Sequence, residues 1–294
     1  MTIATGGFAA PPRSSLFLPA HVRRFVASAA ASGADAVVLD LEDSVPTGQR
    51  GAARAQLADA VKVLGASAEL VVRINAEPSL IEGDLAACAQ AGADGILLPK
   101  VAGPGDMDTL HRVLGRLGYA PRIGILVESC AGLMRIREIL DASGPLRSVA
   151  LGVEDLRHEL EVYAPGGDGD SPAVLWAHGS LVVAATAAGV TPLGILGSIG
   201  ELSDLDRLEH GARAAWRMGY RGAYCIHPKQ VPRLNVAYAP DEKDLRWADA
   251  VIGAAKEKLD AGLGAFTVDG QMVDAPLLER ALRIRRVHES RSLG

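Results

Sequence analysis

Polar and charged side chains follow a series of short aliphatic runs in the sequence, each at the point where a run ends. If these runs are parallel strands of one barrel, their carboxyl ends meet at one edge, so the side chains form one candidate site. A hydrophobic core alone has no need of such a ring. Its members are Asp40, Glu42, Asp43, Arg73, Asn75, Lys100, Glu128, Glu154, Asp155 and His227.

The carboxylates of this ring indicate a metal site. Glu128 and Asp155 end neighbouring runs and are expected to point into one cup, opposite the cluster from Asp40 to Asp43. Carboxylates that converge in a partly desolvated cup repel each other unless a cation neutralises them. Oxygen ligands without cysteine or paired histidine favour a hard ion such as Mg²⁺, with Mn²⁺ as a second option. Any one acid could equally cap a helix or form an ion pair; their joint placement favours a metal.

Three basic side chains of the ring have different predicted roles. Arg73 offers a planar fork that matches a carboxylate, so it could bind an acidic substrate; an ion pair with Glu42 or Asp43 is the structural alternative. Lys100 could form a Schiff base, but surrounding carboxylates raise the pKa of its ammonium group and make it a poor nucleophile. For His227, which precedes a proline, we favour a hydrogen bond within its own loop over general-base catalysis.

Eight aliphatic runs must position these residues. They are continuous rather than alternating, as expected of parallel strands that are buried on both faces. Segments with helical periodicity separate them, and Ser-Gly-Ala-Asp at 32–35 and Ala-Gly-Ala-Asp at 91–94 each close a helix with a left-handed glycine. The runs span residues 14–20, 35–43, 69–75, 94–100, 122–128, 148–155, 190–196 and 222–228.

This alternation predicts an α/β fold, a (β/α)8 barrel of the TIM type, over residues 1–240. An open doubly wound sheet is the alternative architecture, but the glycine-rich Rossmann fingerprint is missing. A bare barrel needs about 250 residues, so residues 241–294 require a separate explanation. We expect them to form a C-terminal helical extension.

The composition argues against several classes of function. The 294 residues are 49% hydrophobic and 22% charged, which indicates a globular protein with a large core. A net charge of −5 makes nucleic acid an unexpected partner. The sequence predicts neither a signal peptide nor a membrane span. Cys88, Cys130 and Cys225 are far apart and form no CxxC, so we expect no disulfide framework, no zinc site and a cytoplasmic location.

Phrases at the ends of the runs, taken in order, resemble the citrate lyase beta subunit family, which includes malyl-CoA and citramalyl-CoA lyases. Each phrase is weak alone, but the ordered set covers nearly the whole chain and is highly specific. The phrases begin at Arg13 (RSSLFLP), Asp40 (DLEDSV), Val72 (VRIN), Leu98 (LPK), Val127 (VESCAG), Gly152 (GVEDL), Cys225 (CIHPKQ) and Asp269 (DGQMVDAP).

The resemblance implies a Mg²⁺-dependent carbon–carbon lyase. Its substrate would be a 3-hydroxyacyl-CoA thioester such as citramalyl-CoA or malyl-CoA, cleaved to acetyl-CoA and a 2-oxo acid (pyruvate or glyoxylate) or formed in the reverse condensation. Glu128 and Asp155 would be the metal ligands, Glu128 also lying against the substrate, while Glu42 and Asp43 would hold metal-bound waters. A homo-oligomer, trimer or hexamer, is implied as well.

The resemblance also assigns three further residues. Arg73 would bind the substrate carboxylate and take part in catalysis, with Arg13 nearby on the substrate or CoA path. An aspartate in a phrase like 270–274 reaches a neighbouring subunit's active site on a lid over CoA, which makes Asp274 the expected acid that protonates the thioester enolate. The structural alternative for Asp274 is to cap the helix that follows it. Asp269 is more simply a turn residue between two short strands.

Three positions depart from the family pattern and argue for an altered substrate. Ala20 stands where the first loop usually has glycine, His178 where an arginine is common, and Gly194 where an aspartate is frequent. Two other functions stay open. One is a class II pyruvate-type aldolase acting on free hydroxy-oxo acids; the other is a non-catalytic or acyl lyase subunit of a citrate lyase-like complex.

Overall fold

The protein divides into two compact units. Its structure, a computed structural model, describes residues 11–65, 67–162, 170–200, 202–260 and 265–292. One unit comprises residues 12–238 and the other contains residues 239–294. The N-terminal residues 1–10, on which the expectation of no signal peptide depends, lie outside the described part.

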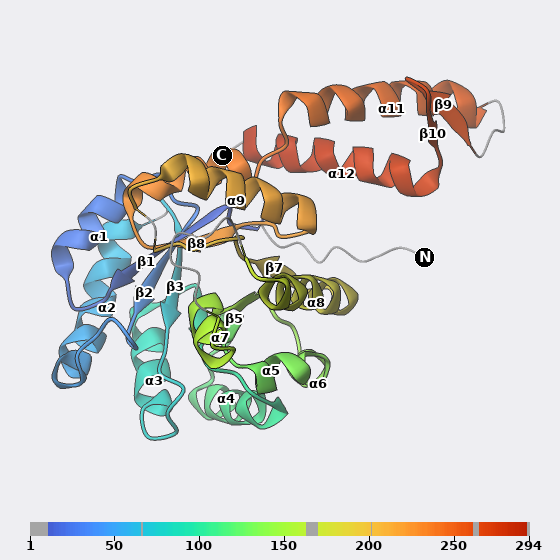
Figure 1. The fold of residues 1–294 in the computed structure, drawn as a ribbon. Coiled ribbons are helices and arrows are strands. Elements are labelled where there is room, and N and C mark those ends of the chain that lie inside the picture. Colours follow the sequence, from blue (N-terminus) through green and yellow to red (C-terminus); the bar gives the residue numbers. More distant parts are fainter. Residues whose placement is uncertain (1–10, 66, 163–169, 201, 261–264, 293–294) are drawn as a thin grey trace. The chain divides into compact units, whose positions relative to one another are not determined.

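Eight parallel strands form the larger unit and confirm the predicted (β/α)8 barrel (Figure 1). Each run predicted to be a strand contains one. Neighbours hydrogen-bond in the order β7-β6-β5-β4-β3-β2-β1-β8. The strands are β1 (Ser14–Pro19), β2 (Ala36–Asp40), β3 (Glu69–Arg73), β4 (Gly95–Leu98), β5 (Arg122–Val127), β6 (Ser148–Leu151), β7 (Thr191–Leu193) and β8 (Ala223–Cys225).

Two backbone hydrogen bonds join β7 to the chain entering β8. Gly194 N donates to Gly222 O over 2.9 Å, and Arg221 N donates to Pro192 O over 3.0 Å. Gly222 is required there for a steric reason, since a Cβ at this position would lie 1.8 Å from the backbone oxygen of Pro12. The bonds close the barrel at the one seam where its short strands do not form a regular ladder.

Helices follow the strands and cover the outside of the barrel (Figure 1). As the periodicity predicts, α2 buries Leu57 and α9 buries Leu208. Gly33 and Gly92 adopt φ of +73° and +74°, which confirms the expected left-handed helix ends. The helices are α1 (Arg23–Ala30), η1 (Thr47–Gln49), α2 (Arg50–Leu64), α3 (Ile81–Ala91), α4 (Pro104–Leu117), α5 (Cys130–Met134), α6 (Ile136–Ala142), α7 (Val153–Glu159), α8 (Pro172–Ala188), α9 (Leu205–Met218), η2 (Pro228–Gln230) and α10 (Val231–Ala237).

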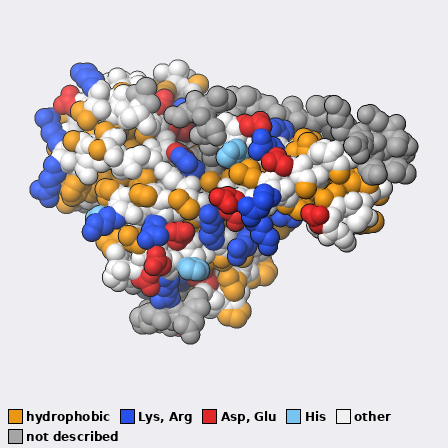
Figure 2. All heavy atoms as spheres, turned by 90° about the horizontal axis from the view of Figure 1, so that it is seen from above, with side chains coloured by type: hydrophobic (Ala, Val, Ile, Leu, Met, Phe, Trp, Pro, Cys, Tyr) orange, Lys and Arg blue, Asp and Glu red, His pale blue; other side chains and the backbone are white. Residues whose placement is uncertain are grey.

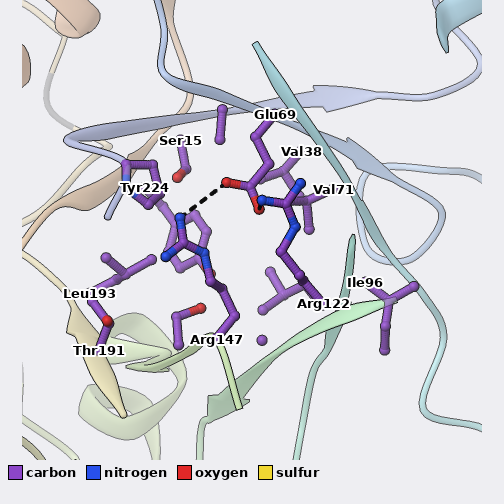
Figure 3. A pocket seen from close by; sticks show the side chains of 15 residues that line it. Ser15, Val38, Glu69, Val71, Ile96, Arg122, Arg147, Thr191, Leu193 and Tyr224 are labelled. Atoms are coloured by element: carbon purple, nitrogen blue, oxygen red, sulfur yellow. Dashed lines mark hydrogen bonds and ion pairs between the residues drawn. The ribbon is translucent and has the colours of Figure 1, made fainter. Parts of the chain in front are cut away.

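Aliphatic side chains fill the barrel interior, as branched residues usually do in this fold. Val38, Leu97, Leu126, Ala150 and Leu193 form this inner cluster. At the amino ends of the strands a small cavity lies below it, and there the Glu69 carboxylate approaches both Arg122 and Arg147 at 3.3 Å (Figure 3). This ion-pair cluster lies at the end of the barrel opposite to the candidate site.

The smaller unit is built from α11 (Glu242–Asp260), the hairpin of β9 (Phe266–Val268) and β10 (Gln271–Val273), and α12 (Ala275–Ser292). Asp269 and Gly270 both have positive φ and form the predicted turn between the two strands. Val251, Phe266, Val273 and Ala281 belong to its own small core. The role of this unit as a lid stays a prediction.

The surface carries mixed charge. On the face in Figure 2, lysine and arginine side chains lie among aspartate and glutamate side chains and do not form one basic field. Among the described residues, no helix is both long and apolar enough to cross a membrane.

The close approach of Gly222 to Pro12 predicts the effect of a single methyl group. Gly222→Ala should destabilise the protein by more than about 2 kcal/mol, because the added Cβ must displace the backbone of Pro12. Gly115→Ala is the control: this exposed α4 position has no atom within 4 Å of an added Cβ, so the helix should gain about 0.5–1 kcal/mol. Urea unfolding measures both, and equal stabilities would contradict the close approach of Gly222 to the backbone of Pro12.

Candidate active site

Arg73 and Asp40 end neighbouring strands at the same level and form a two-pronged ion pair. The register of β2 and β3 places their Cα atoms opposite each other. Arg73 Nε and Nη2 each donate to one oxygen of Asp40 over 2.7 Å. Burial alone would raise the pKa of Asp40, but the guanidinium outweighs this effect and holds that pKa below its ordinary value. The fork expected to meet a substrate is therefore partly occupied by Asp40.

Glu42 and Asp43 both contact Arg73 and Lys100 at the same edge of the barrel. Arg73 Nη1 lies 3.3 Å from Glu42 and 3.4 Å from Asp43, while Lys100 Nζ lies 2.6 Å and 3.1 Å from them. Partial burial acts to lower the pKa of Lys100, but these two carboxylates outweigh it and raise that pKa. Lys100 is thus a charged ion-pair partner, as expected, and a poor Schiff-base nucleophile. Its backbone has φ of +55°, an uncommon conformation outside glycine.

Glu128 follows β5 and lies against Gly152, the residue that follows the neighbouring strand β6. A Cβ at position 152 would come within 2.5 Å of Glu128 Cγ, so the glycine provides the space for this side chain. Glu128 is 8% exposed, and its buried Oε2 has no hydrogen-bond partner among the described residues. Burial, with the charges of Glu42 and Asp155 as smaller contributions, raises the pKa of Glu128 from 4.5 to about 7. The nearby cations contact other carboxylates instead.

A cleft of about 750 Å³, open to solvent at its mouth, brings together Arg73, Glu128 and Asp155. Asp155 lies in the first turn of α7 and is exposed, in contrast to the buried Glu128. Both carboxylates line the same cleft, and the charge of Asp155 contributes to the raised pKa of Glu128. The structure thus brings together the two predicted metal ligands and the predicted substrate arginine.

The residues present fit a divalent ion held by two carboxylates. Glu128 offers a buried oxygen without a partner, and a cation beside it would offset both its desolvation and the repulsion from Asp155. Among the described residues, no group of three His, Cys, Asp or Glu side chains could enclose a metal. Two protein ligands with the remaining positions left to water and substrate suit Mg²⁺, which usually retains several waters.

A buried network behind the cleft holds α7 in place. The carboxylate of Asp170 accepts hydrogen bonds from Arg157 Nη2 and from Gly197 N, the latter over 2.9 Å. Arg157 also donates to Glu154 over 2.8 Å and to Gly197 O over 3.2 Å. The network ties the turn that carries Asp155 to the loop after β7, and both line the cleft.

His178 and Gly194, two positions that depart from the family pattern, are linked through Tyr220. The Tyr220 hydroxyl lies 2.7 Å from His178 Nδ1, and a Cβ at position 194 would lie 2.6 Å from the Tyr220 ring. The aromatic ring thus occupies space that a side chain at 194 would need. Burial lowers the pKa of His178 to about 4, so it is neutral at pH 7. Ala20, the third departure, has no positive φ and donates its N–H to Asp40 O over 3.0 Å.

Arg13 does not line this cleft, Asp274 belongs to the other unit, and His227 has the structural role expected of it. Arg13 precedes β1 at the amino end of the barrel, where its guanidinium pairs with Asp35 over 2.7 Å, so its predicted place on the substrate path is wrong. Asp274 belongs to the smaller unit, where its side chain accepts a hydrogen bond from Leu277 N over 3.4 Å at the start of α12. His227 Nδ1 accepts from Lys229 N over 3.1 Å and caps a short helix, as predicted.

Three interactions of the site were not predicted from the sequence: the pairing of Asp40 with Arg73, the contact of Gly152 with Glu128, and the Asp170 network. The pairing of Asp40 with Arg73 could have been inferred, because both are the last residues of adjacent strands. Gly152 follows a strand in the same way as Glu128, so a close approach between them could also have been suspected. Asp170 gives no comparable signal, since its partners Arg157 and Gly197 become neighbours only in the folded barrel.

Comparison with known proteins agrees with this geometry. The model of the family described as HpcH/HpaI aldolase/citrate lyase matches residues 13–228. The chain belongs to the HpcH/HpaI aldolase/citrate lyase family. Among relatives of this aldolase/citrate lyase family, the citrate lyase subunit beta of Leuconostoc mesenteroides subsp. cremoris is 30% identical and covers 96% of this chain and 94% of its own. The mitochondrial citramalyl-CoA lyase of Rattus norvegicus is also 30% identical, with 93% and 85% covered.

A solved structure of the same family extends the comparison. CitE from Mycobacterium tuberculosis, in complex with magnesium, acetoacetate and coenzyme A, matches with a TM-score of 0.78. It is 31% identical in sequence and covers 96% of this chain and 99% of its own. The named lyases among the relatives agree with the family, and the chain is a carbon–carbon lyase.

The raised pKa of Glu128 predicts how pH affects the stability of the metal-free protein. Between pH 5 and pH 8 the unfolded chain loses the Glu128 proton before the folded protein does, so folding becomes less favourable as the pH rises. In EDTA, Glu128→Gln should therefore gain about 2 kcal/mol of stability relative to the wild type over this range. Guanidinium unfolding at both pH values measures the difference.

Glu138→Gln is the matched control, because Glu138 is an exposed α6 residue whose ion pair with Arg135 lies at the surface. Its stability relative to the wild type should change little with pH. If the stability of Glu128→Gln relative to the wild type depends on pH as little as that of Glu138→Gln, Glu128 is not desolvated.

Proposed function

We propose that this lyase cleaves, or forms, a 3-hydroxyacyl-CoA thioester with the help of Mg²⁺, giving acetyl-CoA and a 2-oxo acid. Citramalyl-CoA and malyl-CoA are the proposed substrates, with pyruvate or glyoxylate as the acid released. The observation that carries the proposal is the buried Glu128 carboxylate, one oxygen of which has no hydrogen-bond partner among the described residues, and which shares a cleft with Asp155 and Arg73.

Each residue of the cleft has a distinct part in this reaction. Glu128 and Asp155 would hold the ion, and Mg²⁺ bound there would supply positive charge to the substrate oxygen that becomes negative as the carbon–carbon bond breaks. Arg73 Nη1 is turned toward Glu42 and Asp43, and we assign it to the substrate carboxylate. Asp40 positions Arg73 by holding its other two nitrogens. Glu42 and Asp43 would orient waters at the rim.

The second product leaves as a thioester enolate and needs one proton at its α-carbon. We assign this proton to Asp274, carried on a lid formed by residues 241–294 of a neighbouring subunit. This part of the proposal includes a homo-oligomer, trimer or hexamer, in the cytoplasm. The capping bond to Leu277 N, at 3.4 Å, is long and leaves the Asp274 carboxylate free to serve both roles.

The proposal is tested with the full chain, Mg²⁺ and a panel of malyl-CoA, citramalyl-CoA and citryl-CoA stereoisomers. Released glyoxylate, pyruvate or oxaloacetate is measured, and at least one thioester should be cleaved only when Mg²⁺ is present. Cleavage of free 4-hydroxy-2-oxo acids without cleavage of any thioester would instead identify a class II pyruvate-type aldolase. If neither type of compound is cleaved, a subunit of a larger lyase complex becomes the better account.

Substitutions separate the assigned roles within the same assay. Glu128→Gln and Asp155→Asn should each lower kcat/KM by more than about 100-fold, because each removes a ligand charge from the ion. Asp274→Asn should lower kcat far more than it changes KM. Glu138→Gln and Asp141→Asn, which break surface ion pairs on α6, are controls and should retain full activity. Unchanged kcat in Asp274→Asn would reduce Asp274 to its capping role.

A further inference from the structure

The two sides of the cleft differ in chemistry. Arg73, Glu128, Glu154 and Asp155 make one side charged. Apolar side chains surround the rest of the cleft, and four of them are less than 9% exposed: Leu126, Leu151, Leu193 and Ile195. The complete apolar set comprises Phe17, Leu126, Leu151, Val153, Leu193, Ile195, Ile199 and Tyr224.

Aromatic rings form the base on which Arg73 lies. The guanidinium carbon of Arg73 is 5.0 Å from the centre of the Phe17 ring, which in turn is 5.1 Å from the centre of the Tyr224 ring. Tyr224 and Leu193 also line the small cavity at the amino end of the barrel (Figure 3). These two side chains therefore separate the cleft from the polar end of the barrel.

Leu193, Ile195 and Ile199 line the part of the cleft that we call the β7 wall, and several polar groups near it are hydrogen-bonded within the protein. Gly194 N donates to Gly222 O, and Gly194 O accepts a hydrogen bond from the Tyr238 hydroxyl. The Tyr220 hydroxyl, behind Gly194, is engaged by His178. A substrate group that faces this wall meets the side chains of Leu193 and Ile195, and the backbone N–H and C=O of Gly194 already have partners.

Arg73 is the one lysine or arginine among the described residues that line the cleft. The parts of the barrel unit that are not described, residues 66, 163–169 and 201, contain neither lysine nor arginine in their sequence. Arg73 already pairs with Asp40 and also contacts Glu42 and Asp43, so it offers no additional charge for a second substrate carboxylate.

From this asymmetry we propose that the 2-oxo acid handled by this chain carries a single carboxylate and an alkyl substituent that faces the β7 wall. The inference rests on the proposed lyase function and narrows its substrate class. An alkyl group gains by burial against Leu193, Ile195 and Ile199. A second carboxylate there would lose its hydration without gaining a lysine or arginine partner among the described residues that line the wall.

The test uses the condensation direction with the full chain, acetyl-CoA, Mg²⁺ and four acids: glyoxylate, pyruvate, 2-oxobutyrate and oxaloacetate. In each case the α-carbon of acetyl-CoA loses a proton and bonds to the ketone or aldehyde carbon, whose oxygen gains a proton. Product acyl-CoA is quantified by mass spectrometry. We expect kcat/KM for pyruvate and 2-oxobutyrate to exceed that for glyoxylate by about tenfold and that for oxaloacetate by about 100-fold or more.

A cation placed on the wall gives a second, independent measurement. Ile199→Arg should shift the ratio of kcat/KM for oxaloacetate over pyruvate upward by at least about tenfold, because it supplies the missing counter-charge. Ile199→Met keeps the wall apolar and should retain the wild-type ranking of the four acids.

The outcomes distinguish the inference from the function on which it rests. If the wild type uses oxaloacetate or glyoxylate as well as pyruvate, the inference on substrate class is wrong and the lyase function stands. If no acid yields an acyl-CoA product and no thioester is cleaved, the lyase function itself fails and the inference falls with it.

Discussion

The fork between Arg73 and Asp40 determines how charge is distributed over the whole mouth of the barrel. By occupying two nitrogens of the guanidinium, Asp40 fixes the direction of the third, which faces Glu42 and Asp43. Lys100 contacts the same two carboxylates from β4. Arg73 and Lys100 therefore both contact carboxylates of the loop that follows β2. Glu128 and Asp155, on the other side, have no such contacts within the described part of the chain, and this imbalance is what makes the cleft suited to a metal ion.

The imbalance is maintained by packing as well as by charge. Gly152 lets the Glu128 side chain lie close to the backbone after β6, where burial keeps its carboxylate away from water. Asp170 and Arg157 hold the turn of Asp155 against the loop after β7 from behind. The apolar floor of Phe17, Tyr224 and Leu193 lowers the local polarity below Arg73. A cation and an acidic substrate would thus enter a site whose charges are already oriented, which is the arrangement that favours electrostatic catalysis.

Much of the fold could be predicted because the eight aliphatic runs and their helical separators follow directly from local periodicity. The site could be predicted in outline because parallel strands place all their carboxyl ends at one edge. The sequence does not predict which side chains at that edge pair with one another. It suggests Glu42 or Asp43 as the ion-pair partner of Arg73, whereas the register of β2 and β3 makes Asp40 its main partner.

The role predicted for Arg13 differs from its position in the structure for another reason. Arg13 precedes the first run, so its position alone puts it at the amino end of the barrel, and pairing with Asp35 holds it there. The family resemblance assigned it to the substrate path in spite of that position. The Asp170 network could not be foreseen because its members are joined only by tertiary packing, as are Tyr220, His178 and Gly194.

We infer that Glu128 is a buried carboxylate that gives up its proton to bind Mg²⁺. Calorimetric titration of the metal-free protein with Mg²⁺, in buffers of different ionisation enthalpy, counts the protons released per ion bound. With a pKa of about 7 for Glu128, we predict release of about half a proton per Mg²⁺ ion bound at pH 7 and close to none at pH 9. Binding without proton release at pH 7, or release that is unchanged in Glu128→Gln, would contradict it.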